Sequence, residues 1–335
     1  MTHIAVAGAG AIGCFVGGLL ATAGHQVRFL ARAETCAEIA AHGLSMTDYS
    51  GLEHHLPAPE FSASPGSLAE AELILVTCKT GATAEMAQLI EAHAAPEALI
   101  VSLQNGLDAV ETLRAALPGR DIRAAMVPFN VVRAAPGAFH RASSGDITVQ
   151  VGPLPDLSAP GLNWHHHPDI RAVQYGKLLI NLNNALNALA DIPILSQLED
   201  RTWRRLMADQ MAEALHVLRA AGIKPAKTTA APPRLIPHIL RLPTPLFRRI
   251  AAQMLTVDPT ARTSMWDDLS RRRQTEIGAL QGHIEMLGQQ IAVPTPINSA
   301  IASAIHEAEN AGLGPPGLGA RALRERIGQA DQMER

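Results

Sequence analysis

The sequence has few cysteines, no basic stripe and no long apolar run, and each shortage excludes a class of protein. Its three cysteines, Cys14, Cys36 and Cys78, lack C-x-x-C spacing. An odd, unpaired set argues against a disulfide framework or a zinc site and favours a reducing cytoplasm. The net charge of -3 argues against a nucleic-acid partner. No uninterrupted apolar run reaches the roughly 18 residues of a membrane span. We therefore expect a cytoplasmic protein that binds neither nucleic acid nor membrane.

Histidines occur in two runs, His54-His55 and His165-His166-His167. Consecutive side chains point in different directions, and neither an H-x-x-x-H spacing nor a carboxylate partner accompanies them. The sequence therefore predicts no metal site.

The chain is too long for one ordinary hydrophobic core. Its 335 residues, of which 47% are hydrophobic, predict two domains. The segment Gly152–Asp169 is rich in proline, glycine and histidine and has little periodicity, so we interpret it as the boundary region. We expect one domain over residues 1–168 and a second over residues 169–335, with the active site between them.

The chain begins with the pattern of a strand, a glycine turn, a helix and a second strand. His3–Ala7 is a short apolar run that leads into a G-x-G-x-x-G motif. Apolar residues at helical spacing follow, Gly24 closes the helix, and Gln26–Leu30 has the pattern of the next strand. The alternative interpretation of this segment is a signal peptide, but the segment has no basic n-region. This context makes the motif specific for a dinucleotide, with these cofactor-binding candidates: Gly8, Ala9, Gly10, Ala11, Ile12 and Gly13.

The three glycines of the motif have separate predicted roles. Gly8 permits a tight turn, Gly10 lets the backbone approach a pyrophosphate, and Gly13 lets the helix pack closely on the strand. The positive end of the helix then favours the phosphates.

Arg32 follows the second strand, where an NAD-specific fold usually carries an acidic residue. A cation at this place suits the 2′-phosphate of NADP(H). Glu34 lies close by and keeps NAD(H) as an alternative, and Arg32 could also be a solvated charge.

Two further apolar runs, Leu73–Thr77 and Leu99–Leu103, have the pattern of buried parallel strands, with helical sequence between them. This alternation predicts a doubly wound α/β fold, in which ligands bind beyond the carboxyl ends of the strands. Lys79 and Asn105 follow the two runs and are candidates for contacts with the cofactor and the substrate. In the alternative interpretation, Lys79 is a solvated loop lysine and Asn105 belongs to a turn-forming Asn-Gly pair. Residues 121–151 are expected to add short antiparallel strands.

The second half of the chain has mostly helical periodicity. Lys177, Asn181 and Asn184 recur at i, i+4 and i+7, which places them on one face of a predicted helix. A lysine among asparagines on an apolar helix is costly to bury, so this face is a candidate site. The alternative is an amphipathic helix whose polar face is exposed to solvent. Ser264 and Glu276 fall in a later predicted helix, where the alternatives are an N-cap and a surface carboxylate.

Taken together, these motifs resemble the ketopantoate reductases (2-dehydropantoate 2-reductases) of pantothenate biosynthesis. The resemblance spans most of the chain and implies an α/β fold: an N-terminal Rossmann-type doubly wound domain plus an all-helical C-terminal domain, as in the 6-phosphogluconate dehydrogenase group. It also implies a homodimer. It rests on Gly8 to Gly13, Cys78-Lys79-Thr80, Gln104-Asn105-Gly106, Lys177 to Asn181, Ser264-Met265, Thr275-Glu276-Ile277 and Ile291 to Pro296.

The resemblance implies reduction of the 2-oxo acid ketopantoate to pantoate with NADP(H). Lys177 is then the catalytic acid and Glu276 a catalytic partner that contacts substrate. Arg32 and Lys79 serve NADPH, and Asn105 lies where cofactor and substrate meet. The implied substrate-binding residues are Asn105, Asn181, Asn184 and Ser264.

Two departures leave the substrate open. Family members commonly carry Asn-Pro where this chain has Ala185-Leu186, with an asparagine one position earlier at Asn184. The stretch Pro225–Pro245 is unusually rich in proline. One alternative is therefore a reductase of another 2-oxo acid. A non-catalytic NADPH sensor is a second, although it would be expected to lose Lys177 or Glu276.

Overall fold

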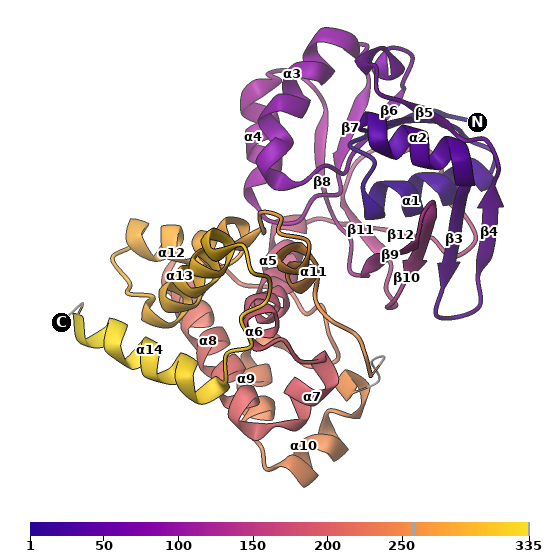
Figure 1. Ribbon diagram of the computed structural model, residues 1–335. Helices are drawn as coiled ribbons and strands as arrows, with labels where there is room; N and C mark the ends of the chain where they lie inside the picture. Colours follow the sequence, from indigo (N-terminus) through magenta and orange to yellow (C-terminus); the bar gives the residue numbers. More distant parts are fainter. Residues whose placement is uncertain (256–258, 334–335) are drawn as a thin grey trace. The chain divides into compact units, whose positions relative to one another are not determined.

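The computed structural model describes residues 1–255 and 259–333, and the chain forms two compact units, Met1–Arg171 and Ala172–Arg335 (Figure 1). The first unit is built on two sheets. Its strands are β1 (His3–Ala7), β2 (Gln26–Leu30), β3 (Leu44–Asp48), β4 (Glu53–Leu56), β5 (Glu60–Ser62), β6 (Leu73–Val76), β7 (Leu99–Ser102), β8 (Ile122–Met126), β9 (Val131–Ala135), β10 (Ala138–Arg141), β11 (Ile147–Gln150) and β12 (Trp164–His167).

The larger sheet has the order β12-β11-β8-β7-β6-β1-β2-β5. The strands from β8 to β5 pair in parallel, so their carboxyl ends meet at one edge. The chain leaves β1 toward β2 on one side and continues through β6, β7 and β8 on the other. This reversal is the topological switch point at which doubly wound folds bind ligands. The predicted α/β class is confirmed.

Helices cover both faces of this sheet (Figure 1). Helix α1 packs against the larger sheet through Gly17, which approaches Phe29, and against the smaller sheet through Gly18, which approaches Met46. A helix covered on two sides needs apolar residues all round, as this glycine-rich and leucine-rich segment has. The helices of the unit are α1 (Ala11–Thr22), α2 (Ala33–His42), α3 (Thr83–His93) and α4 (Asp108–Ala116).

The pairing of residues 121–151 differs in part from the expectation. As expected, β11 pairs antiparallel with β8, and β10 pairs antiparallel with β9. Strand β8, however, is parallel to β7, because α4 carries the chain across before it. Strands β9 and β10 leave this sheet and form the smaller one, of order β4-β3-β10-β9. The predicted boundary region Gly152–Asp169 also contains a strand, β12, which pairs with β11.

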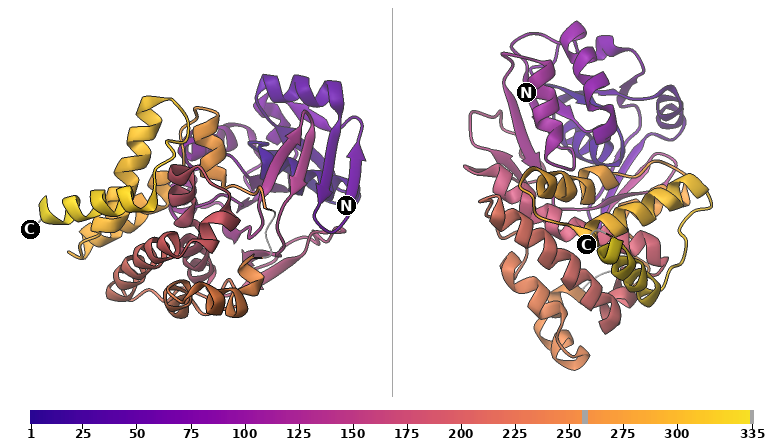
Figure 2. Two further views of the ribbon diagram at one scale, coloured as in Figure 1. Left: turned by 60° about the horizontal axis from the view of Figure 1, so that its bottom comes forward. Right: turned by 90° about the vertical axis from the view of Figure 1, so that its left-hand side faces the viewer.

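The second unit consists of helices in the residues described (Figures 1 and 2). Its core is formed by apolar side chains from α5, α6, α8, α12 and α13. The helices are α5 (Ile170–Asn181), α6 (Asn183–Ala190), α7 (Ile194–Glu199), α8 (Arg201–Ala220), α9 (Ile236–Leu240), α10 (Thr244–Ile250), α11 (Ser264–Ser270), α12 (Gln281–Gln290), α13 (Pro296–Ala311) and α14 (Ala320–Met333). No described helix is both long and apolar enough to cross a membrane.

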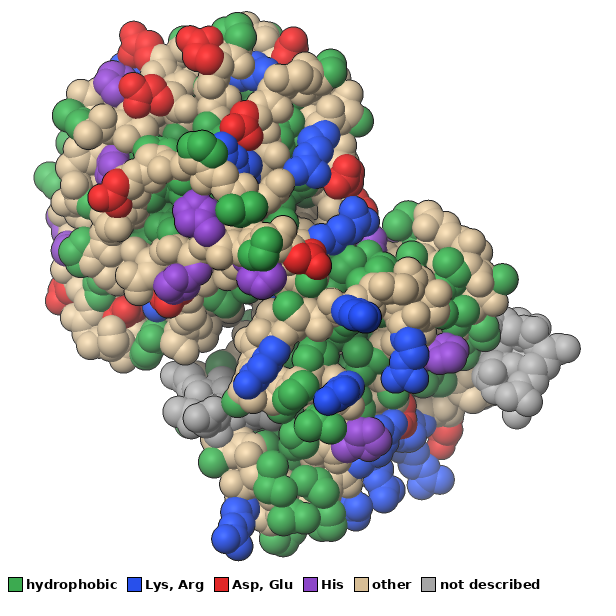
Figure 3. Space-filling view, turned by 180° about the vertical axis from the view of Figure 1, so that it is seen from behind, with side chains coloured by type: hydrophobic (Ala, Val, Ile, Leu, Met, Phe, Trp, Pro, Cys, Tyr) green, Lys and Arg blue, Asp and Glu red, His purple; other side chains and the backbone are tan. Residues whose placement is uncertain are grey.

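The proline-rich stretch forms the short helices α9 and α10 at one end of this unit (Figure 1). In the reverse view of Figure 3, Lys and Arg side chains are spread over the helical unit among hydrophobic ones. The stretch from Lys224 to Arg249 carries lysines and arginines and no carboxylate.

Candidate active site

The glycine motif forms the turn between β1 and α1. Gly8 has φ +87°, a conformation that glycine adopts without strain. The N–H groups of Gly8 and Ala9 donate to the Leu30 carbonyl at 3.1 and 2.9 Å. The turn is therefore held against the carboxyl end of β2.

Gly10 is the N-cap of α1 and is exposed, and no side chain caps this helix. A Cβ added at Gly10 would meet no atom closer than the Gly8 carbonyl oxygen at 4.0 Å. The backbone is thus open to a ligand at the positive end of α1, where an anion is stabilised. These residues fit the pyrophosphate of a dinucleotide.

Gly8 and Gly13 are closely packed instead of open. A Cβ at Gly8 would lie 2.5 Å from the Cβ of Cys78, and one at Gly13 would overlap the Thr77 side chain. The Thr77 hydroxyl also donates to the Gly8 carbonyl at 2.8 Å. The glycine turn and the segment after β6 therefore form one rigid edge of the site.

Arg32 lies exposed after β2, as the N-cap of α2. No carboxylate forms an ion pair with it among the residues described, although Glu34 lies in the first turn of the same helix. Lys79 is also exposed, in extended backbone after β6.

Gln104 connects the segments that follow β6 and β7, a role that the sequence did not suggest. Its buried amide donates to the Cys78 carbonyl at 3.1 Å and to the Thr83 hydroxyl at 2.7 Å. Next to it, the Asn105 carbonyl accepts from the Thr80 hydroxyl at 3.1 Å. A polar residue directly after a buried strand was the available signal. The glycine motif, Arg32, Lys79 and Asn105 thus follow four neighbouring strands at one sheet edge.

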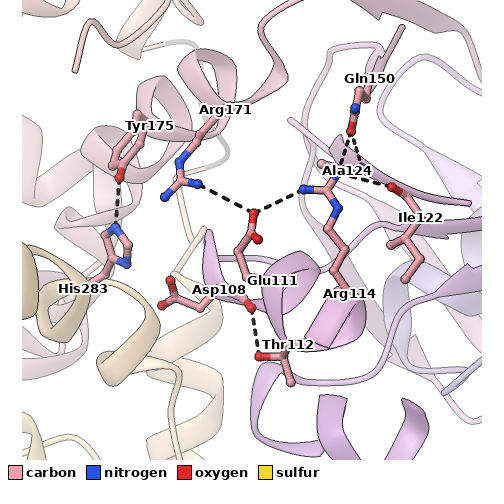
Figure 4. Close-up of polar contacts among 10 residues, drawn as sticks. All are labelled: Asp108, Glu111, Thr112, Arg114, Ile122, Ala124, Gln150, Arg171, Tyr175 and His283. Carbon is pink, nitrogen blue, oxygen red and sulfur yellow. Dashed lines mark hydrogen bonds and ion pairs between the residues drawn. The ribbon is translucent and has the colours of Figure 1, made fainter. Parts of the chain in front are cut away.

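In the second unit, Lys177 lies on α5 and is only partly exposed. Burial lowers its pKa from 10.5 to about 8, while the Glu276 carboxylate acts in the opposite direction. Tyr175, two residues earlier, has its hydroxyl 3.2 Å from the His283 ring of α12 (Figure 4). Because both rings are buried, this contact fixes α5 next to the lysine.

The first unit carries an ion-pair cluster around Glu111 of α4, which also includes Arg171, the last residue of this unit, in the first turn of α5. Glu111 lies 3.2 Å from Arg114 and 3.7 Å from Arg171 (Figure 4). All three side chains are exposed, so the pairs contribute little stability.

The predicted continuous helix through Lys177, Asn181 and Asn184 is interrupted at one residue. Helix α5 ends at Asn181, and α6, which carries Asn184, begins at Asn183. Leu182 between them keeps helical angles, φ -54° and ψ -30°, and its N–H donates to the Leu178 carbonyl at 3.0 Å. Two glutamine side chains from elsewhere in the unit donate to the Leu182 carbonyl.

The later predicted helix is also shorter than expected. Thr263 is its N-cap, so Ser264 is the first residue of α11 and is exposed. The helix ends at Ser270, and Arg272 adopts φ +54°. Glu276 instead precedes a short 3-10 turn, Ile277–Ala279. Among the described residues, no cluster of histidine, cysteine or carboxylate side chains could hold a metal ion.

Two family models match the chain. The model described as ketopantoate reductase PanE/ApbA matches residues 4–153, and its C-terminal counterpart matches residues 169–309. The 2-dehydropantoate 2-reductase of Caulobacter vibrioides is 26% identical over 92% of this chain and 99% of its own. That of Halobacterium salinarum is 22% identical over 92% and 100%.

Solved structures of similar fold include members of the same family. The PanE/ApbA family ketopantoate reductase from Ralstonia eutropha JMP134 has a TM-score of 0.78 and 28% identity, over 92% of this chain and 99% of that one. D-mandelate dehydrogenase, solved with NADH and anilino(oxo)acetate, has a TM-score of 0.77 at 22% identity, over 92% and 99%, and shares the fold. The chain therefore belongs to the ketopantoate reductase family, a family of nicotinamide-dependent oxidoreductases.

Proposed function

We propose that this protein reduces 2-dehydropantoate to pantoate with NADPH, in pantothenate biosynthesis. The observation that carries the proposal is Lys177, whose pKa is lowered to about 8 by burial beside Glu276. A general acid is most effective when its pKa lies near the working pH.

The cofactor is held, in this proposal, by the edge of the larger sheet. The open backbone at Gly10 and the uncapped α1 receive the pyrophosphate, and the whole motif from Gly8 to Gly13 forms this cradle. Arg32 binds the 2′-phosphate, for which a guanidinium is well shaped, and Lys79 adds a second cation. When bound, the nicotinamide supplies the hydride.

Lys177 acts on the substrate oxygen. Its ammonium stabilises the negative charge that grows on the carbonyl oxygen and then donates a proton to it. Glu276 keeps the lysine protonated and accepts a hydrogen bond from a substrate hydroxyl. Neutral donors hold the carboxylate and the hydroxyl of the substrate, which orients its carbonyl: Asn105, Asn181, Asn184 and Ser264.

The wider assignments follow from this activity. We propose residues 1–168 as the NADP-binding domain and residues 169–335 as the substrate and dimerisation domain. The protein would act as a homodimer in the cytoplasm.

Reduction of a different 2-oxo acid is the second candidate. It is favoured by the fold shared with D-mandelate dehydrogenase and by Ala185-Leu186, which replace the expected Asn-Pro pair. Both candidates use the same lysine.

The test is NADPH and NADH oxidation over a panel of 2-oxo acids. Ketopantoate is expected to give the highest kcat/KM, and a higher value for another acid would select the second candidate. Lys177→Ala should lower kcat by about 10²–10⁴-fold with NADPH binding nearly intact. A variant that keeps more than about a third of wild-type turnover on every acid would remove the lysine from the mechanism.

A further inference from the structure

Two side chains from distant parts of the sequence donate to the carbonyl of Leu182, the residue between α5 and α6. The Gln210 amide of α8 donates to the Leu182 carbonyl at 3.1 Å, and the Gln281 amide of α12 donates to it at 2.8 Å. Gln210 and Gln281 are 1% and 0% exposed. We call these two amides and the carbonyl that they share the Leu182 clamp.

The clamp has a cost that a purely structural core would avoid. Burying an amide is unfavourable unless its hydrogen bonds are made. The side-chain oxygen of Gln281, Oε1, has no hydrogen-bond partner among the described residues. The junction of α5 and α6 contains no proline or glycine, since Asn181-Leu182-Asn183 occupies it. Leu182 itself keeps helical angles, φ -54° and ψ -30°, and its carbonyl is held by two buried amides from α8 and α12.

Helix α6 in turn fixes the beginning of α11. The Asn187 side-chain oxygen accepts from the Thr263 N–H at 3.2 Å, and the Thr263 hydroxyl donates to the Asn184 carbonyl at 3.2 Å. Thr263 caps α11, whose first residue is Ser264. Asn184 and Ser264 therefore move together with α6, whereas Lys177 and Asn181 belong to α5.

We propose that Gln210 and Gln281 are positioning residues, which set the spacing of Asn184 and Ser264 from Lys177 and Asn181 through the Leu182 clamp. This inference rests on the function proposed above. Lys177 contacts the carbonyl oxygen of the substrate, whereas Asn184 and Ser264 bind the rest of the substrate molecule. The clamp thus determines which length of 2-oxo acid is accepted.

The test compares Gln281→Met and Gln210→Met with the wild type. Methionine keeps the length of glutamine and removes the donor. The ratio of kcat/KM for ketopantoate to that for 3,3-dimethyl-2-oxobutanoate, which lacks only the distal hydroxyl, should fall at least about tenfold, because small misplacements are costly. The Michaelis constant for NADPH should stay within about twofold, since the cofactor motif is untouched.

Ile147→Ala is the matched control. Ile147 is 0% exposed on β11 of the first unit, outside every helix that forms the clamp, and its truncation lowers the melting temperature. It should leave the substrate ratio unchanged. If Ile147→Ala shifts the ratio as much as Gln281→Met does, lost stability explains the effect and the proposal falls.

A crystal structure of the Gln210→Met/Gln281→Met double variant separates this proposal from the activity. The angle between α5 and α6 should change. If the wild type reduces no 2-oxo acid, the proposed function fails and this angle alone decides the role of the clamp. An unchanged angle would overturn the clamp even in an active reductase.

Discussion

The Glu276 carboxylate raises the pKa of Lys177, against a larger lowering by burial, and the balance leaves this pKa at about 8. Lys177 belongs to α5, and Glu276 directly precedes the 3-10 turn Ile277–Ala279 that follows α11. Without the carboxylate, burial would push the lysine further toward its neutral form. The carboxylate thus keeps a buried acid protonated near neutral pH.

The pH dependence of kcat should report this balance. A general acid must be protonated, so kcat should fall as the pH rises through about 8. Glu276→Gln removes the interaction that raises the pKa, and its alkaline limb should therefore move to lower pH. Steady-state rates from pH 6 to 10 at saturating substrate measure the alkaline limb of the wild type and that of Glu276→Gln. A limb that stays in place in Glu276→Gln would show that this carboxylate does not control the lysine.

The local features of the fold could be predicted from the sequence. The glycine motif, the strands on either side of it and the polar residues after β6 and β7 depend on neighbours within a few residues. The glycines predicted for a tight turn and for close packing, Gly8 and Gly13, have those environments.

Features that depend on distant partners could not be predicted. The smaller sheet pairs β3 with β10, and no sequence pattern in either segment indicates that the other is its partner. The contacts at the Leu182 carbonyl likewise come from α8 and α12, so the local i, i+4, i+7 pattern predicted one continuous helix. Thr263 caps α11 in place of Ser264, and because serine and threonine are both favoured caps, the sequence alone does not select between these neighbours.

Arg32 should distinguish the two nicotinamide cofactors. Arg32→Ala is expected to raise the Michaelis constant for NADPH by about 10-fold or more and that for NADH much less, because a charge-assisted hydrogen bond is worth about 1.5–3 kcal/mol. Lys79→Ala should show a weaker form of the same effect. Initial rates with each cofactor provide the measurement. Equal effects on NADPH and NADH would show that Arg32 does not bind the 2′-phosphate.

Two glycines of the motif should respond oppositely to alanine. Gly10 has φ -86° and open space around it, so Gly10→Ala should leave unfolding in urea unchanged and weaken NADPH binding. Gly8 has φ +87°, and a Cβ added to it would lie 2.5 Å from the Cβ of Cys78, so Gly8→Ala should destabilise the protein by about 1–3 kcal/mol. If Gly10→Ala bound NADPH as tightly as the wild type, the pyrophosphate would have to lie elsewhere.

Arg204 should be the main anchor of the proline-rich stretch. This arginine is 0% exposed, and its guanidinium lies 4.3 Å from the centre of the Phe247 ring. It donates to the Leu240 and Leu242 carbonyls, both at 3.1 Å, in the segment around α9. It also donates to the carbonyl oxygens that end α7, those of Leu198 and Glu199, at 2.7 and 3.0 Å.

Arg204→Met should therefore cost at least about 3 kcal/mol of unfolding free energy, because several buried carbonyls lose a charged donor at once. Arg204→Lys should not restore it, since an ammonium on a flexible stem cannot reach the acceptors of a planar fork. Arg248→Gln is the matched control: its pair with Glu199, at 2.8 Å, is exposed, and its loss should cost less than about 1 kcal/mol. Urea unfolding measures all three variants. A cost for Arg204→Met no larger than that for Arg248→Gln would mean that proline rigidity, rather than this guanidinium, holds α9 and α10 against α8.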